Sequence, residues 1–243
     1  MKYLINDILR QFGYRISRIP PDEGLNAFEV QKMLLGEAVV DLTIFDVGAY
    51  KGDVTLIYKK LFPDSKVYCF EPFPISFSIL KKNTSSQCNI FAINKGLGEY
   101  TGKSEFHSNR SAPTNSILAT LDESRHTWGD GLLDTIETIE IDMETLDDFV
   151  RNNHIDKIDI LKLDAQGSEY MVLNGARNTL EEGKIKMIYS EIIILPTYKG
   201  QKYLDEFLLL LRSYGFDLYN FFNCSFTRKG MLRQLDAIFI KSE

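Results

Sequence analysis

The stretch from Thr43 to Thr55 reads TIFDVGAYKGDVT, and it decides how the fold is interpreted. It opens with a short apolar run of β type, which ends at Asp46-Val47-Gly48, and a helical pattern begins after Gly52. A strand that breaks at glycines and turns into a helix brings backbone N–H groups and the positive end of a helix dipole to one point. The glycine spacing is G-x-x-x-G rather than the G-x-G-x-x-G of dinucleotide sites. By itself the stretch therefore predicts only a site for a polar or anionic ligand.

The composition is that of an ordinary globular protein. The chain has 243 residues, 44% hydrophobic and 26% charged, with a net charge of −6. This length suffices for a large core, and no basic block points to nucleic acid as a partner. The three cysteines, Cys69, Cys88 and Cys224, lack the spacing of a disulfide framework or a metal site. We therefore expect buried thiols and a reducing, cytoplasmic location.

Residues 1–40 are predicted to form a helical arm that precedes one domain at 41–243. Apolar residues follow helical spacing within 1–18, and a second short helix is expected over Phe28–Leu35, ending near Gly36. The sequence has no continuous apolar run of about 18 residues, so no transmembrane segment is predicted. We expect the arm to pack on its own domain or to form a homo-oligomer contact, in preference to lying on a membrane surface.

Strand and helix patterns alternate along the domain. Strands are expected at 43–47, 66–70, 89–93, 158–163, 186–194, 216–222 and 235–240. Helical patterns separate the first six, which predicts an α/β fold with a doubly wound, mostly parallel seven-stranded sheet. Because no helix separates the last two strands, they are expected to pair as an antiparallel C-terminal hairpin.

The segment from 94 to 143 has a different pattern. Ser104–His107 and Thr135–Ile141 alternate as antiparallel strands do. Between them, 108–133 is polar and contains the only tryptophan, Trp128. We interpret it as a lid or substrate loop, with Trp128 and Asn115-Ser116 as candidate acceptor contacts.

Carboxylates stand near the ends of several expected strands, where open α/β sheets bind ligands. Glu71 follows 66–70, close to the spacing of about 20 residues at which an acidic residue accepts hydrogen bonds from ribose hydroxyls. Asp164 follows 158–163, where it either contacts a ligand or caps the next helix. Glu191 lies inside an apolar strand, so its charge must be paired or functional.

Three motifs taken together resemble the FkbM-type family of S-adenosylmethionine-dependent methyltransferases. They are DVGAYKG at 46–52, FEPFP at 70–74 and LKLDAQGSE at 161–169. Gly96-Leu97-Gly98, Thr145-Leu146-Asp147 and Leu173–Ala176 also fit the family pattern, so the resemblance covers about residues 43 to 222. It implies a class I methyltransferase fold and S-adenosylmethionine as cofactor.

The resemblance also implies the cofactor-binding residues. Asp46, Gly48 and Gly52 would surround the methionine part. Glu71 would hold the ribose hydroxyls. The implied set is completed by Pro72, Phe73 and Leu97, which would flank the adenine, and by Gly96 and Asp164.

The reaction implied by the resemblance is O-methylation of a small-molecule or glycan acceptor, such as a sugar. A sugar hydroxyl is a poor nucleophile while protonated, and a positioned base adds roughly 10²- to 10⁴-fold. Asp164, Glu191 and His107 are the candidates for that base. Asp164 and Glu191 could instead hold a divalent cation, and the sequence leaves the metal open. Where the family often has a glutamate two residues after the strand-end aspartate, this chain has Gln166.

Two alternative functions stay open. Gln166 motivates the first, a cofactor-binding subunit without catalysis. The second is a nucleotide-dependent oxidoreductase, against which the missing G-x-G-x-x-G motif counts. Glu71 and Asp164 indicate that carboxylates rather than cationic groups surround the glycine turn. Such a turn suits a cofactor with an amino group, a sulfonium and a free ribose better than a pyrophosphate.

Overall fold

The computed structural model of the chain describes residues 24–36, 40–129 and 131–242. The chain divides into two units, 1–36 and 37–243. The described part of the first unit contains helix α2 (Ala27–Leu35), which ends at Gly36, as the sequence predicts. The helix expected within 1–18 lies outside the described residues. No helix in the described part of the chain is long and apolar enough to cross a membrane.

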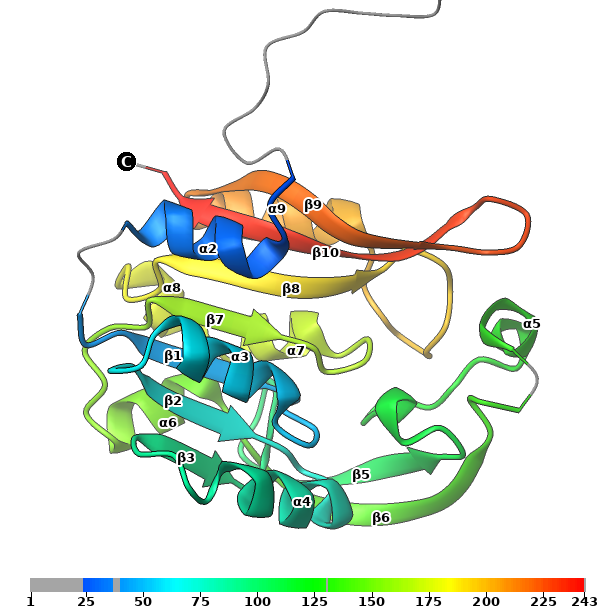
Figure 1. Cartoon of the computed structure of the whole chain (residues 1–243). Coiled ribbons are helices and arrows are strands. Elements are labelled where there is room, and N and C mark those ends of the chain that lie inside the picture. The colour runs from blue at the N-terminus through cyan, green and yellow to red at the C-terminus, as the bar shows by residue number, and fades with distance from the viewer. Residues whose placement is uncertain (1–23, 37–39, 130, 243) are drawn as a thin grey trace, which may run out of the picture. The chain divides into compact units, whose positions relative to one another are not determined.

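A seven-stranded sheet forms the centre of the second unit (Figure 1). Its order is β3-β2-β1-β7-β8-β10-β9. The strands are β1 (Thr43–Val47), β2 (Lys66–Phe70), β3 (Ile90–Ile93), β7 (Ile160–Leu163), β8 (Met187–Ile193), β9 (Phe216–Phe226) and β10 (Leu232–Lys241). The first five pair in parallel, whereas β10 is antiparallel to both β8 and β9. This confirms the predicted mostly parallel sheet with its C-terminal hairpin.

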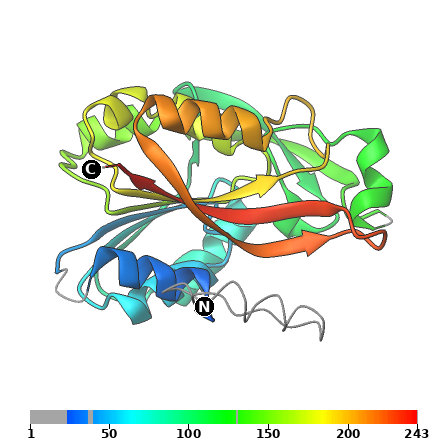
Figure 2. The same cartoon turned by 90° about the horizontal axis from the view of Figure 1, so that it is seen from above.

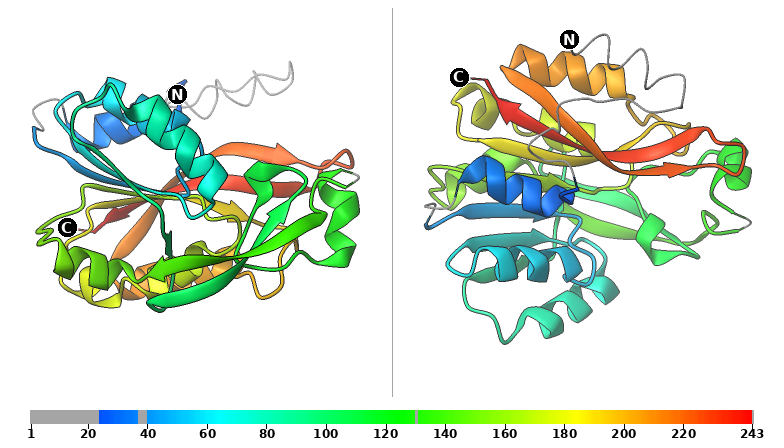
Figure 3. Two further views of the ribbon diagram at one scale, coloured as in Figure 1. Left: turned by 90° about the horizontal axis from the view of Figure 1, so that it is seen from below. Right: turned by 45° about the horizontal axis from the view of Figure 1, so that its top comes forward.

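Helices cover both faces of this sheet (Figures 2 and 3). On one face lie α3 (Asp53–Leu61) and α4 (Pro74–Thr84). On the other lie α6 (Leu146–Asn152), α7 (Glu169–Asn174), α8 (Arg177–Glu181) and α9 (Leu204–Ser213), the last drawn in orange. The larger core fills this second side, where Phe149 of α6 packs edge-on against Phe45 and Phe70 with ring centroids 5.7 and 4.8 Å away. Because both faces are covered, the central strands are almost continuously apolar.

A separate three-stranded sheet has the order β4-β6-β5. It consists of β4 (Gly96–Leu97), β5 (Gly102–Asn109) and β6 (Thr135–Glu144). The antiparallel pairing of β5 with β6 confirms the sequence pattern. The described residues of the predicted loop between them include three short helical turns, η1 (Ala112–Thr114), η2 (Asp122–Ser124) and α5 (Arg125–Trp128).

The cysteines differ from expectation. Cys69 is buried, but Cys88 and Cys224 are exposed. The prediction that all three thiols are buried is therefore wrong for two of them, because Cys88 lies in the turn before β3 and Cys224 lies on the edge strand β9.

Candidate active site

A cavity of about 330 Å³ lies where β1, β2 and β7 end and where the end of β8 meets the loop between β5 and β6. This is the carboxyl edge of the parallel strands, beside the switch point between β1 and β7. Seven of the predicted site residues line it: Gly48, Glu71, Pro72, Gly96, Leu97, Asp164 and Glu191. Four do not: Asp46, Gly52, Phe73 and His107.

Gly48 makes the turn after β1 sterically feasible. Its φ is +74°, and a Cβ atom there would lie 1.8 Å from the carbonyl oxygen of Asp164. Only glycine allows the two strand ends to approach so closely. Gly52 is required for a different reason. A Cβ atom there would lie 2.8 Å from the Leu80 side chain, so glycine allows α4 to pack next to the turn.

A buried ion pair supports this turn from behind. Lys162 Nζ lies 3.0 Å from Asp46 Oδ1 and donates a 3.1 Å hydrogen bond to the Gly48 carbonyl. The Thr55 hydroxyl donates to Asp46 Oδ2 at 2.6 Å, and both charged side chains are at most 5% exposed. Burial alone would lower the pKa of Lys162, but Asp46 and Asp164 together raise it above its ordinary value. Asp46 therefore fixes the turn through Lys162 and does not face the cavity.

Lys162 also corrects the sequence interpretation. Carboxylates are not the only charges around the glycine turn, because this ammonium group lies directly against it. The sequence feature that indicates this buried ammonium group is a single lysine within the apolar strand Ile160–Leu163. In a sheet covered on both faces such a side chain cannot reach solvent, so it needs a buried partner.

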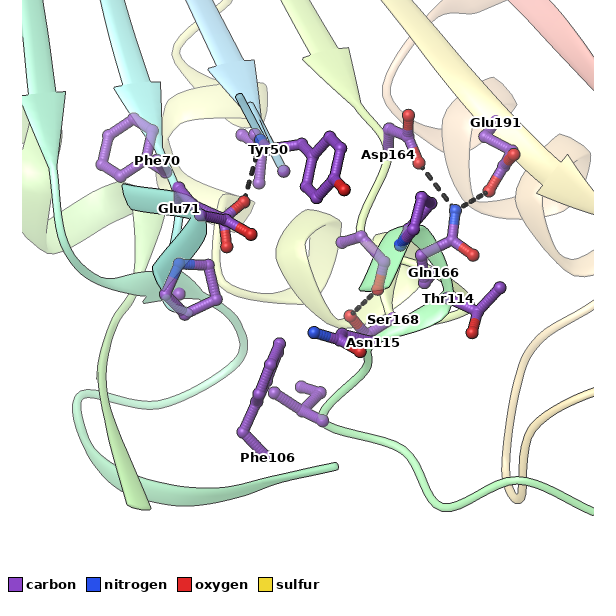
Figure 4. Close-up of a pocket in the computed structure, with 18 of the residues that line it drawn as sticks. Tyr50, Phe70, Glu71, Phe106, Thr114, Asn115, Asp164, Gln166, Ser168 and Glu191 are labelled. Carbon is purple, nitrogen blue, oxygen red and sulfur yellow. Dashed lines mark hydrogen bonds between the residues drawn. The ribbon is translucent and has the colours of Figure 1, made fainter. Parts of the chain in front are cut away.

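Glu71 is held by backbone N–H groups at the end of β2. Tyr50 N donates to Oε2 at 2.8 Å (Figure 4). Phe73 N donates to Oε1 at 2.9 Å. Burial raises the pKa of Glu71 to about 7, although the two N–H groups counteract this shift. A carboxylate has roughly four lone-pair positions. Those that remain can accept hydrogen bonds from a ligand in the cavity.

An apolar slot lies beside Glu71. Pro72, Leu97, Phe106 and Met143 line it. Phe73 is buried and stacks on Phe106 with ring centroids 5.9 Å apart, and of these two rings it is Phe106 that lines the cavity. The family resemblance implies Phe73 at this position. The contact between β5 and the turn after β2, which brings Phe106 there, cannot be read from the local sequence pattern.

Asp164 and Glu191 meet across the cavity from Glu71, and Gln166 joins them (Figure 4). Gln166 Nε2 donates to Asp164 Oδ1 at 2.9 Å and to Glu191 Oε2 at 2.7 Å. Its Oε1 accepts a 3.2 Å hydrogen bond from the Tyr198 hydroxyl, which fixes the orientation of the amide. Gln234 Nε2 donates to the other oxygen of Glu191 at 3.0 Å. Burial, followed by the charge of Asp164, raises the pKa of Glu191 well above its ordinary value.

Asp164 and Glu191 are also candidate ligands of a metal ion, together with Glu169. One oxygen each of Asp164, Glu169 and Glu191 lies within 4.8 Å of the others. Glu169, however, accepts hydrogen bonds from Ala165 N at 2.7 Å and Gly167 N at 3.2 Å. The NH₂ group of Gln166 bridges the other two and is a donor, not a metal ligand. The arrangement is thus that of a hydrogen-bonded carboxylate pair.

The predicted substrate loop contributes Thr114, Asn115 and Trp128 to the lining. Trp128 Nε1 donates to Thr197 Oγ1 at 2.8 Å, and the guanidinium carbon of Arg233 lies 4.5 Å from the Trp128 ring centroid. These contacts hold the indole in place. Ser116 is buried and binds the Gln166 carbonyl through its hydroxyl at 2.8 Å instead of lining the cavity.

His107 lies away from this lining. Its backbone pairs with Ser116, and its Nδ1 lies 3.4 Å from the Thr138 hydroxyl on β6. The structure thus brings two of the three candidate bases together, Asp164 and Glu191, and leaves the histidine on the small sheet.

Comparisons with known proteins identify relatives of the chain. The Methyltransferase FkbM domain family matches residues 46–218. The 2-O-methyltransferase NoeI of Sinorhizobium fredii (strain NBRC 101917 / NGR234) is 26% identical over 184 residues, which is 72% of each chain. The 31-O-demethyl-FK506 methyltransferase FkbM of Streptomyces tacrolimicus is 28% identical over 193 residues, 71% of this chain and 72% of that one.

Among solved structures, methyltransferase FkbM from Methylobacillus flagellatus KT superposes with a TM-score of 0.51 at 16% identity. The match covers 83% of this chain and 43% of the other. At this identity the likeness establishes the fold, which is that of class I methyltransferases.

Proposed function

The chain belongs to the FkbM methyltransferase domain family, and on this premise we propose that it transfers a methyl group from S-adenosylmethionine to a hydroxyl oxygen of a sugar or related metabolite. One observation carries the proposal: carboxylates lie on both sides of one cavity. On one side, backbone N–H groups hold Glu71. On the other side, the Gln166 side chain holds Asp164 and Glu191 together.

The residues at the β2 end fit the adenosine part of the cofactor. Glu71 has lone pairs left for two ribose hydroxyls, and its negative charge disfavours a 2′-phosphate. The slot of Pro72, Leu97 and Phe106 offers flat apolar surfaces to an adenine ring. When bound, S-adenosylmethionine supplies a methyl group that its sulfonium already activates.

The residues at the β7 end fit the methionine part. Gly48 N–H is engaged with the Phe70 carbonyl, and the carbonyl of Gly48 with Lys162, so the turn is rigid. Asp164 lies beside that turn with its side chain 38% exposed, and its carboxylate suits a ligand ammonium group. We therefore assign Asp164 to cofactor binding.

Glu191 is our candidate for the base that takes the proton of the acceptor hydroxyl. Its raised pKa makes the ionised Glu191 carboxylate a stronger base but also favours its protonated form, so Glu191 acts as base only when ionised. A well-placed base contributes roughly 10²- to 10⁴-fold. Gln166 and Gln234 fix both of its oxygens, which orients the group toward one acceptor position. Such positioning supplies a large share of catalysis in bimolecular transfers, about 7–11 kcal/mol at best.

Calorimetry and methyl transfer test this proposal. We expect S-adenosylmethionine and S-adenosylhomocysteine each to bind with one site, and labelled methyl groups to appear on hydroxylated acceptors. Absence of binding at millimolar cofactor would refute the proposal. Binding without transfer to any hydroxylated acceptor would favour a non-catalytic subunit, and binding of a nicotinamide dinucleotide instead would favour an oxidoreductase.

A further inference from the structure

The hairpin of β9 and β10 extends beyond the seven-stranded sheet. The last residue pair between β10 and β8 towards the turn is Gln234 with Ile193, whereas β10 continues to pair with β9 as far as Leu232 and Phe226. Figures 1 and 2 both show this end of the hairpin projecting away from the other strands. We call residues 226–232 the hairpin tip.

Hydrogen bonds within the hairpin tip give it a defined shape. Thr227 N donates to the Met231 carbonyl at 2.8 Å, and Gly230 N donates to the Thr227 carbonyl at 2.9 Å. The Thr227 hydroxyl accepts a hydrogen bond from Met231 N at 3.1 Å. Arg228 and Lys229 are therefore the outermost residues of a closed turn, and both are exposed.

Exposed cations and exposed apolar side chains occur together on the tip. Phe226 and Met231 are 56% and 55% exposed, and Arg228 and Lys229 lie between them in the chain. Among the described residues, no ion pair involves either cation. The segment 218–235 contains no aspartate or glutamate, although the chain has a net charge of −6. The tip is thus a local site of positive charge on an acidic protein.

This combination of side chains fits the surface of a bilayer that contains anionic lipids. Negative headgroups attract lysine and arginine, and each such residue near the surface strengthens binding roughly five-fold. Phenylalanine and methionine side chains are stabilised when they leave water for the boundary of the acyl chains. A protein partner fits the tip less well, because so small a surface buries far less than the roughly 1,000 Å² of a stable interface.

The tip continues directly into the wall of the cavity. Gln234, three residues after Met231, lines the cavity, and three residues of extended strand span roughly 10 Å. The guanidinium carbon of Arg233 lies 4.5 Å from the ring centroid of Trp128, which also lines the cavity. A surface that binds the tip would therefore hold the cavity close to it.

We propose that the hairpin tip binds membrane surfaces that contain anionic lipids, with Arg228 and Lys229 at the headgroups and Phe226 and Met231 at the acyl boundary. The contact is peripheral and reversible, and salt weakens it because salt screens its electrostatic part. This inference goes beyond the proposed function and does not depend on it, because the four side chains lie outside the cavity lining.

Vesicle co-sedimentation of the full chain tests the proposal. The probes are phosphatidylcholine vesicles with and without phosphatidylglycerol, at low and at high salt. We expect binding to the vesicles that contain phosphatidylglycerol at low salt. The partition coefficient should fall by at least about ten-fold without that lipid or at high salt. Absence of binding to both kinds of vesicle, or equal binding to both, would overturn the proposal.

Two pairs of charge substitutions locate the contact. Arg228→Gln combined with Lys229→Gln should lower the partition coefficient by at least about ten-fold. The matched control, Lys81→Gln combined with Lys82→Gln, removes two exposed cations at the end of α4, which lies beside the opposite edge strand β3 (Figure 1). The control should change binding by less than about three-fold, because charges distant from the membrane are screened. Equal losses in the two variants would contradict a contact at the tip.

Two pairs of apolar substitutions test insertion separately from charge attraction. Phe226→Ser combined with Met231→Ser should also lower the partition coefficient by at least about ten-fold. The control, Leu209→Ser combined with Ile75→Ser, changes side chains that are 75% and 65% exposed elsewhere and should leave binding unchanged. Circular dichroism and thermal melting verify that each variant is folded. Unchanged binding of the folded tip variant would refute insertion.

Sedimentation velocity without lipid covers the alternative occupant of the tip, a second copy of the chain. We expect the sedimentation coefficient of the wild type to equal that of Phe226→Ser combined with Met231→Ser. A dimer of the wild type that these substitutions disrupt would assign the tip to a contact between copies and would overturn the proposal.

Discussion

The two ends of the cavity hold their carboxylates by different means. Glu71 is fixed by two backbone N–H groups, from Tyr50 and Phe73. Glu191 is fixed by two side-chain amides, from Gln166 and Gln234. Backbone donors are present in any sequence that adopts these turns, whereas a side-chain donor can be exchanged by one substitution. The Glu71 end of the cavity is therefore set by the fold, and the Glu191 end is set by individual side chains.

The largest expected effect comes from Glu191→Gln. If Glu191 is the base, kcat should fall by about 10²- to 10⁴-fold while the affinity for S-adenosylhomocysteine stays nearly constant. Steady-state methyl transfer and calorimetry measure the two quantities. Asp164→Asn serves as comparison and should mainly weaken cofactor binding. A larger loss of kcat in Asp164→Asn than in Glu191→Gln would move the base to Asp164.

At the other end, Glu71→Ala should weaken cofactor binding by about 100-fold. Two hydroxyl hydrogen bonds to a charged group contribute about 1.5 kcal/mol each at the low end, and each 1.4 kcal/mol is a factor of ten. The control is Glu144→Gln, which changes a buried carboxylate that pairs with Lys95 outside the cavity lining. Similar affinities in both variants would show that Glu71 does not contact the ribose.

The pH dependence of cofactor binding should also come from Glu71. Burial raises the pKa of Glu71 to about 7, so its carboxyl is mostly protonated at pH 6 and mostly ionised at pH 8. If only the ionised form accepts both hydroxyl hydrogen bonds, cofactor affinity should rise about ten-fold between these pH values. Calorimetry of the wild type against Glu71→Ala checks this. A slope that persists in the variant would assign the titration to another group.

The smallest effect is expected from Gln166→Glu. The substitution replaces the bridging donor with a third carboxylate, and about 1 kcal/mol of like-charge repulsion corresponds to roughly a five-fold loss of turnover. Mg²⁺ should recover that loss in the variant, whereas the wild type should respond to neither EDTA nor Mg²⁺. A wild-type activity that disappears in EDTA and returns with Mg²⁺ would mean that a cation acts at the carboxylate pair.

The sequence by itself determined the sheet and one end of the site. Apolar runs, each broken by glycine, proline or an acidic residue, are local signals, and they placed β1 and β2 at their observed bounds. Gly48 and Glu71 follow those runs directly, so their position at the carboxyl edge was a consequence of strand order and direction. The same logic placed Asp164 after β7.

Tertiary structure alone decided the rest, because those contacts join residues far apart in the chain. Lys162 meets Asp46, and Phe106 takes the cavity position expected for Phe73, through packing that no local pattern encodes. Gln234 reaches Glu191 only because β10 returns antiparallel beside β8. Hydrophobic periodicity reports which face of a strand is buried, but it does not report which polar side chain will stand opposite another across the sheet. Side-chain partnerships of that kind define the end of the cavity that holds Asp164 and Glu191.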